Sequence, residues 1–175
     1  LPIGSKPCIQ YIVEELAACG VEEILIITGQ KKRAIEDHFD KDNELNRLLH
    51  RSEQPDLLQA LAYEDMAVQF FYTRQSSPAG LGDAIRLAES VVNNEPFIVA
   101  LGDSLIFSQN NPPLLERMLN LYQQNPGAMV IGTREVPRDD VSKYGIIKPA
   151  GEVTGNVIEI ADVVEKPSPQ TAPST

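Results

Sequence analysis

The spacing of apolar residues switches repeatedly between a helical and a strand period along the chain. Helical spacing predicts helices over residues 6–19, 31–39, 81–92 and 112–124, and a pair of helices in the leucine-rich residues 43–65, separated at Pro55. Short apolar runs predict strands over residues 23–28, 68–73, 97–101 and 128–133. Several of these runs are apolar throughout, which is typical of strands buried on both faces. The pattern therefore predicts an α/β fold with a mainly parallel sheet flanked by helices.

The pattern changes after Val136. Residues 144–148 and 153–160 are predicted to form a β-hairpin near the C-terminus, around the turn at residues 149–152. A last strand over residues 162–166 runs into Pro167, which should leave the sheet. No internal repeat interrupts the chain, so residues 1–175 are expected to form a single domain, with residues 170–175 interpreted as a loop that stops within the fold.

Composition narrows the class of partner. The chain has 175 residues and a net charge of −10, which argues against broad binding to nucleic acid or to an anionic membrane. No apolar run is long enough to cross a membrane, and no signal peptide is recognisable. Cys8 and Cys19 fall in one predicted helix, about 16 Å apart, which is too far for a disulfide. Free thiols in a reducing cytosol, and hence a cytoplasmic protein, are expected.

A first candidate for chemistry is Asp103, which follows Gly102 at the carboxyl end of the predicted strand 97–101. Ligands bind at this end of the strands in open α/β sheets. An aspartate there is placed to hold Mg²⁺ on a triphosphate, and the glycine lets a ligand come close. The alternative interpretation is an aspartate that caps the next helix.

A second candidate is the glycine-containing loop over residues 76–84, between a predicted strand and a predicted helix. Backbone N–H groups near Gly80 could bind an anion or the edge of a base. Gln75, just before the loop, carries both a donor and an acceptor, which suits a pyrimidine edge. The loop matches neither standard phosphate-binding glycine motif, so a plain turn and a solvated glutamine remain the alternatives.

A third candidate is the pair Glu165 and Lys166 before Pro167. The lysine ammonium could contact a phosphate as a point charge. In a regular strand the two side chains point to opposite faces, so the strand must twist or bulge if both are to face one ligand. The alternatives are a surface ion pair and two separately solvated charges. No Ser/His/Asp set is visible, and His38 and His50 belong to no metal-binding spacing.

Taken together, these segments resemble bacterial UTP–glucose-1-phosphate uridylyltransferases, which are sugar nucleotidyltransferases. The resemblance covers nearly the whole chain in order, and residues 28–40 (TGQKKRAIEDHFD) are its most specific part. The other similar segments are residues 7–15, 74–75, 80–84, 101–103, 135–137, 144–146 and 164–167.

The resemblance implies a Rossmann-like nucleotidyltransferase domain that makes UDP-glucose and pyrophosphate from UTP and glucose-1-phosphate. By position, Gln75 and Gly80 would hold the uracil, and Asp103 would bind Mg²⁺. The family's sugar contacts fall on Gly145 and Glu165, and its contact to the adjacent phosphate falls on Lys166. Asp103 and Lys166 would therefore be the catalytic residues. The resemblance also implies a homo-oligomer.

Some features depart from the family pattern. The family's first strand and its glycine-rich loop with arginine should precede Leu1, and a further metal-binding aspartate should follow Thr175, so the domain is expected to be incomplete at both ends. Position 83 is Asp where the uridylyltransferases usually have His, which weakens the base assignment. Two alternatives therefore stay open: a related enzyme using dTTP or another hexose phosphate, and a catalytically silent module that binds a nucleotide sugar. Whether this piece is active alone also stays open.

Overall fold

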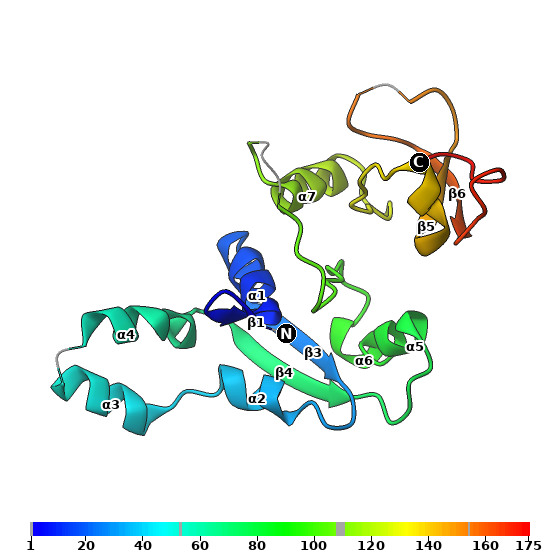
Figure 1. The fold of residues 1–175 in the computed structure, drawn as a ribbon. Coiled ribbons are helices and arrows are strands. Elements are labelled where there is room, and N and C mark those ends of the chain that lie inside the picture. Colours follow the sequence, from blue (N-terminus) through cyan, green and yellow to red (C-terminus); the bar gives the residue numbers. More distant parts are fainter. Residues whose placement is uncertain (1, 53, 108–110, 154) are drawn as a thin grey trace. The chain divides into compact units, whose positions relative to one another are not determined.

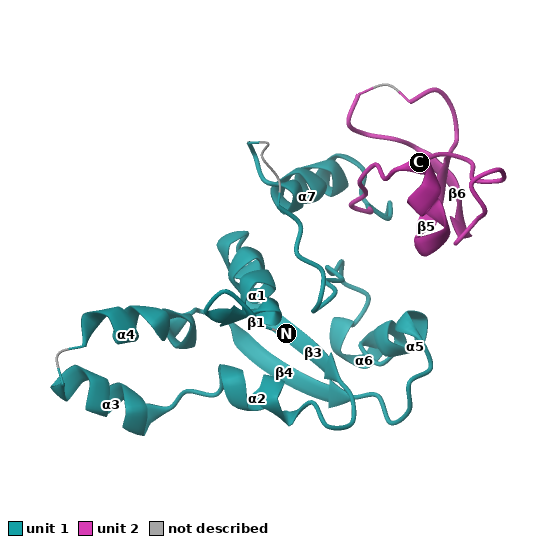
Figure 2. Ribbon diagram, in the orientation of Figure 1, with its two compact units in different colours: residues 1–130 teal, residues 131–175 magenta. Residues whose placement is uncertain are grey.

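The computed structural model describes residues 2–52, 54–107, 111–153 and 155–175. It divides into two compact units, residues 1–130 and residues 131–175, which are coloured separately in Figure 2. Each unit is described by itself below. The expectation of a single domain stays a prediction.

Unit 1 is built on a parallel pair of strands, β3 (Glu23–Thr28) and β4 (Gln69–Arg74). Their register is regular, with Glu23 opposite Gln69 and Thr28 opposite Arg74. The crossover between them contains α2 (Arg33–Phe39), α3 (Asn43–Arg51), α4 (Pro55–Ala60) and the 3₁₀ helix η1 (Ala62–Asp65) (Figure 1). A helical crossover is what a parallel pair requires. The predicted strands at residues 23–28 and 68–73 and the helix break at Pro55 are confirmed.

Helix α1 (Cys8–Ala18) supplies the centre of this unit. It follows two short paired strands, β1 (Pro2–Ile3) and β2 (Lys6–Pro7). Cys8, Ile12 and Leu16 of α1 form one apolar cluster, and the neighbouring face of the helix packs Val13 against Ile26 and Phe39. Cys8 and Cys19 are both free thiols, as predicted.

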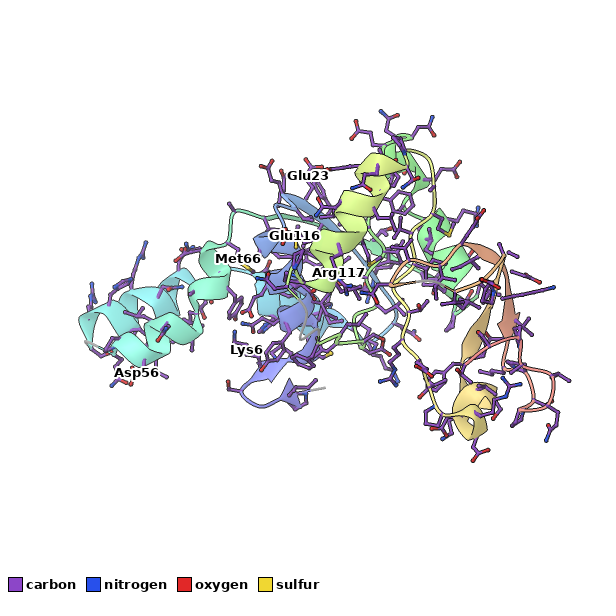
Figure 3. The ribbon with its side chains drawn as sticks, turned by 90° about the horizontal axis from the view of Figure 1, so that it is seen from above. Lys6, Glu23, Asp56, Met66, Glu116 and Arg117 are labelled. Atoms are coloured by element: carbon purple, nitrogen blue, oxygen red, sulfur yellow. The ribbon has the colours of Figure 1, made fainter. Side chains whose placement is uncertain are left out.

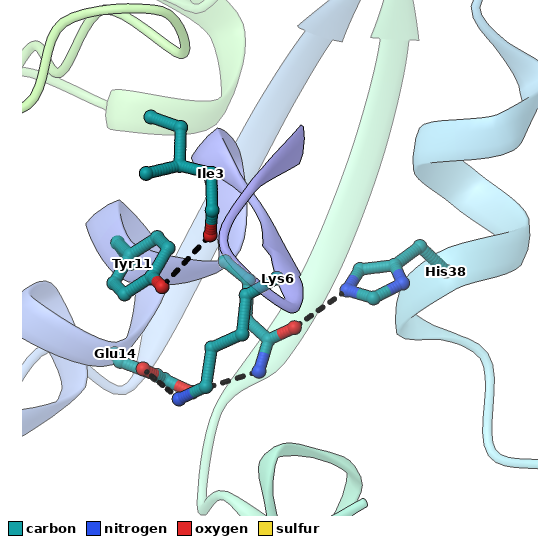
Figure 4. A network of polar contacts seen from close by, with 6 residues as sticks. Ile3, Lys6, Tyr11, Glu14 and His38 are labelled. Atoms are coloured by element: carbon teal, nitrogen blue, oxygen red, sulfur yellow. Dashed lines mark hydrogen bonds and ion pairs between the residues drawn. The ribbon is translucent and has the colours of Figure 1, made fainter. Parts of the chain in front are cut away.

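Helix α1 also carries a polar network that reaches α2 (Figure 4). Gln10 is only 2% exposed, and its side chain bonds His38 Nε2 at 3.0 Å and Glu14 Oε1 at 2.8 Å. Since the Gln10 amide nitrogen donates to Glu14, its oxygen accepts from His38. The His38 ring also stacks on Tyr63 at 4.7 Å between centroids. Burial lowers the pKa of His38, although the Glu64 carboxylate opposes this shift.

The free energy of unfolding is therefore expected to fall in mild acid, because protonation of His38 is less favourable in the folded chain. A lowered folded-state pKa means that the unfolded chain binds its proton first, so the contribution is complete above about pH 6.5 and is lost as the pH falls through the lowered value. His38→Phe keeps a ring against Tyr63 but cannot titrate. Urea unfolding at about pH 7.5 and about pH 5.5 should show a smaller acid loss for this variant. The same change at the exposed His50 is the control, and an unchanged acid loss in His38→Phe would contradict the assignment.

The remaining helices of unit 1 are α5 (Leu81–Arg86), α6 (Glu89–Val92) and α7 (Leu114–Gln124). The predicted helix over residues 81–92 is thus two short helices. Leu115 of α7 packs against the Cys8 cluster of α1. Its neighbours Glu116 and Arg117 are labelled in Figure 3. In the part of the chain that the structure describes, no helix is long and apolar enough to span a membrane.

Two predicted strands are wrong. Residues 97–101 and 128–133 have no regular secondary structure, and neither belongs to any of the three sheets formed by the described residues. Their side chains are exposed rather than buried, with Phe97 at 54%, Val99 at 47% and Met129 at 87%. An apolar run becomes a strand only where a neighbouring strand takes its backbone hydrogen bonds. The sequence pattern identifies the apolar run, but it does not show whether another strand lies beside it.

Unit 2 contains the 3₁₀ helix η2 (Arg138–Lys143) and an antiparallel hairpin of β5 (Gly145–Pro149) and β6 (Ile160–Glu165). The hairpin is confirmed, but its second arm is the strand predicted at residues 162–166, not residues 153–160. Residues 150–159 instead connect the two strands, with the irregular register after Lys148 where the pairing ends. The unit's small core consists of Val136, Val141, Ile146 and Ala172.

Arg138 ties the C-terminal residues to unit 2. Its guanidinium donates to the carbonyl oxygens of Pro169 at 2.8 Å, Ala172 at 2.9 Å and Ser174 at 3.2 Å. Ser174 Oγ also donates to the Ile147 carbonyl oxygen at 2.6 Å, which fixes this segment against β5. Residues 168–174 are therefore a hydrogen-bonded part of the unit.

Replacing Arg138 with Met should lower the free energy of local opening in unit 2, because three carbonyl oxygens lose a charged donor. Since this donor is mostly exposed, we expect a loss of only about 1–2 kcal/mol. Hydrogen exchange of the amides in β5 and residues 168–174 measures this. Arg138→Lys keeps the charge but not the planar fork, so it should recover only part of the protection. Equal protection from hydrogen exchange in Arg138→Met and in the unmodified chain would show that the Arg138 hydrogen bonds do not hold residues 168–174.

Candidate functional site

Gln75 lies at the carboxyl end of both strands of the parallel pair. It follows directly after β4, and its backbone N–H donates to the Thr28 carbonyl oxygen at 2.9 Å. This bond continues the pairing of β3 and β4 by one step. The end of the strands where Gln75 is held is the edge at which α/β sheets bind ligands.

The side chain of Gln75 closes the glycine-containing loop. Its Nε2 donates to the Gly80 carbonyl oxygen at 3.3 Å, so the structure brings together the two residues predicted to hold uracil. Gly80 has φ 92°, which is in the region that favours glycine, and α5 begins at the next residue. Residues 76–79 between them are exposed. The loop thus leaves an open surface beside the Gln75 amide.

Asp83, in the first turn of α5, also contacts Gln75, although in the sequence it stands out only as a departure from the family pattern. Gln75 Nε2 donates to Asp83 Oδ2 at 2.8 Å, and Arg86 Nη2 donates to Asp83 Oδ1 at 3.2 Å. The hydrogen bond from Gln75, followed by that from Arg86, holds the pKa of Asp83 below its usual value. The i,i+3 spacing of Asp83 and Arg86 was the signal available in the sequence.

Asp103 lies in a turn on unit 1. Ser104 N donates to the Leu101 carbonyl oxygen at 3.1 Å, and Ser104 Oγ lies 3.4 Å from Asp103 Oδ1. The turn is held against α1, since Leu105 packs on the Cys8 cluster. The carboxylate of Asp103 is exposed. The sequence predicts that Asp103 ends the most buried strand, whereas in the structure it follows residues 97–101, which belong to no sheet.

A single exposed carboxylate suits one type of Mg²⁺ site. Protein sites for Mg²⁺ commonly use one or two carboxylates and leave the remaining positions to water and substrate phosphates. Among the described residues, no group of three or more His, Cys, Asp or Glu side chains could hold a metal alone. Asp103 therefore fits a magnesium ion carried with a phosphorylated ligand, and the described residues do not form an all-protein metal cage.

In unit 2, Gly145 and Glu165 lie opposite one another in the β5–β6 register. A Cβ atom at position 145 would lie only 3.3 Å from Glu165 Oε2, so the Glu165 side chain reaches across the strand over this glycine. A Cβ atom at this position would require the Glu165 carboxylate to shift by a few tenths of an ångström. The hairpin thus brings together the two residues predicted to contact the sugar.

Lys166 follows β6 with φ 46°, an uncommon and mildly strained conformation for a residue other than glycine. Its backbone N–H donates to the Tyr144 carbonyl oxygen at 3.0 Å. Lys166 Nζ lies 3.6 Å from Glu165 Oε1, so the two side chains form a surface ion pair, which is one of the alternatives to a ligand site. Both side chains are exposed, so this ion pair adds little to stability.

The predicted site residues thus form two groups and one separate member. Gln75 joins Gly80 in unit 1, and Gly145 joins Glu165 and Lys166 in unit 2. Asp103 lies in unit 1, and among the described contacts no hydrogen bond links it to Gln75 or Gly80.

The chain is similar to several known proteins. The sequence model of the nucleotidyl transferase family matches residues 1–175. A UTP–glucose-1-phosphate uridylyltransferase of Staphylococcus epidermidis is 44% identical over 99% of this chain and 59% of its own length. The uridylyltransferase YngB of Bacillus subtilis is 46% identical over 99% of this chain and 57% of its own.

A solved structure shows the same relationship in three dimensions. UDP-glucose pyrophosphorylase complexed with UDP-glucose matches with a TM-score of 0.83 and 38% identity, over 99% of this chain and 62% of that one. The chain thus spans about three fifths of the length of the relatives it matches. This likeness confirms the α/β class that the parallel pair and its helices indicate. Because the family match extends over every position, from the first helix to the Lys166 turn, the chain belongs to the nucleotidyl transferase family.

Proposed function

We propose that the chain transfers a uridylyl group from UTP to glucose-1-phosphate, giving UDP-glucose and pyrophosphate. The observation that carries the proposal is the turn at Glu165 and Lys166, where a carboxylate and an ammonium lie 3.6 Å apart. A carboxylate accepts hydrogen bonds from sugar hydroxyls, and an ammonium attracts a phosphate, so the pair suits a sugar phosphate. The names of the similar proteins support the same choice.

The nucleotide is proposed to bind at the other group of residues. Gln75 and Gly80 would hold the uracil, with the amide reading the base and the glycine allowing it to come close. Gly145 and Glu165 would hold the glucose, and Lys166 would contact its phosphate. Each of these roles is a proposal that rests on the contacts described above.

The proposed chemistry is an in-line displacement. A phosphate oxygen of glucose-1-phosphate attacks the α-phosphorus of UTP, the bond to the β-phosphate breaks, and pyrophosphate leaves with its electron pair. The protein needs no nucleophile of its own, so its contribution is to align the reactants and neutralise charge. Lys166 would serve both purposes. Asp103 would hold Mg²⁺, which supplies further neutralisation of the triphosphate charge when bound.

The proposed setting is a cytoplasmic homo-oligomer. The free thiols of Cys8 and Cys19 suit a reducing compartment. The exposed apolar side chains of residues 97–101 offer a surface on which copies could pack. No nucleic acid or membrane partner is proposed, in keeping with the charge of −10.

The base assignment is tested by calorimetric titration of the chain with UDP-glucose and with dTDP-glucose, in the presence of Mg²⁺. Tighter binding of UDP-glucose is expected, and Gln75→Ala should weaken it about tenfold through the loss of one or two hydrogen bonds. Gln69→Ala, at the exposed opposite end of β4, is the control. Unchanged binding in Gln75→Ala would show that the base is held elsewhere.

A further inference from the structure

The amide of Gln75 is held in one of its two orientations. Its Nε2 atom lies 2.8 Å from Asp83 Oδ2 and 3.3 Å from the Gly80 carbonyl oxygen. A carboxylate and a carbonyl can only accept hydrogen bonds, so the NH₂ group and not the oxygen must face them. Both N–H groups of the amide are thereby engaged within the loop. The carbonyl oxygen Oε1 is the atom left to meet a ligand.

Asp83 is the stronger of the two anchors because it is charged and its bond is the shorter. Arg86 donates to its other oxygen, Oδ1, at 3.2 Å, and so orients the carboxylate. The lowered pKa of Asp83, caused first by the bond from Gln75, keeps it an acceptor at neutral pH. The backbone of Gln75 is fixed independently by its bond to Thr28. What Asp83 controls is therefore the direction of the amide and not the position of the residue.

We infer that Asp83 is a positioning residue that makes Gln75 present only an acceptor to the base, so that the site selects a base with a donor at N3. This inference rests on the proposed contact of Gln75 with the nucleotide. Uracil carries a hydrogen on N3 and can donate to Oε1. Cytosine has a lone pair at N3, which would face another lone pair. Without Asp83, only the longer bond to the Gly80 carbonyl oxygen holds this orientation, so the amide can turn over far more readily and serve either base.

The test compares the affinity of the chain for UDP-glucose with that for CDP-glucose, measured by calorimetry. The unmodified chain should prefer the uridine ligand by at least about tenfold, the effect of one well-made hydrogen bond against a repulsive contact. In Asp83→Ala this ratio should fall to within about threefold of unity, with CDP-glucose binding strengthened. Asp83→Asn keeps an acceptor oxygen and should give an intermediate ratio. Glu89→Ala, an exposed acid on α6, is the control and should keep the full ratio.

The readout separates positioning from a structural role. If Asp83 only supported the loop, its loss would weaken both ligands equally and leave the ratio unchanged, which would overturn the inference. If Gln75→Ala abolishes the preference but Asp83→Ala keeps it, the inference fails and the proposed base contact stands. If Gln75→Ala leaves UDP-glucose binding unchanged, the proposed contact fails, and the inference fails with it.

Discussion

Replacing Asp103 with Asn is expected to lower the rate of UDP-glucose synthesis at least about 100-fold, a typical cost of removing a metal-holding charge. The change keeps the shape of an exposed side chain in a turn already fixed by Ser104 and Leu101, so the fold should be retained. Binding of UDP-glucose without Mg²⁺ should change little. The measurement is the steady-state rate over a range of Mg²⁺ concentrations.

The matched control is Asp56→Asn, which removes the same charge from the exposed surface of α4 (Figure 3). This variant should keep the full rate and the same Mg²⁺ dependence. The assignment of Asp103 would be wrong if its Asn variant retained more than about a third of the rate, since a metal-holding carboxylate contributes far more than that.

Replacing Lys166 with Met should lower kcat about 100- to 1,000-fold, because the attacking phosphate of glucose-1-phosphate loses a fixed positive charge beside it. Met preserves the length of the side chain, and the ion pair that it removes is exposed and contributes little to stability. Lys166→Arg keeps a charge with a different shape and should recover part of the rate. Rate measurements at saturating substrate separate this effect from weakened binding.

Lys143→Met is the matched control in the same unit. Lys143 is also an exposed lysine beside a carboxylate, that of Asp140, but it lies in η2 and outside the proposed site. The rate should be unchanged in this variant. Similar losses in the Lys143 and Lys166 variants would mean that a general change in charge, and not a local contact, is responsible.

The sequence was sufficient for the parts of the site that depend on local patterns. The period of apolar residues located β3 and β4, and with them the place of Gln75 at their carboxyl ends. The alternation of side chains in a strand required a twist or bulge at Lys166 if Glu165 and Lys166 are to face one ligand, and the structure gives Lys166 a positive φ. These inferences needed only residues that are near one another in the chain.

The parts that could not be predicted depend on pairing between distant segments. Residues 97–101 have the composition of a buried strand, yet burial also needs a neighbour that the pattern does not name. Residues 153–160 and 160–165 both have strand-like spacing, and only the register with β5 selects the second as its partner. The hydrogen bond from Gln75 to Asp83 depends on how the chain folds back between β4 and α5, so residue spacing alone did not reveal it.

The central claim is uridylyl transfer to glucose-1-phosphate, and the most direct test is product formation by the chain supplied with UTP, glucose-1-phosphate and Mg²⁺. The account predicts that UDP-glucose and pyrophosphate appear in equal amounts, and that dTTP or another hexose phosphate is used more slowly. Binding of UDP-glucose without any turnover would contradict the claim and favour a silent binding module. Equal or faster use of dTTP would contradict the assignment of uridine as the base.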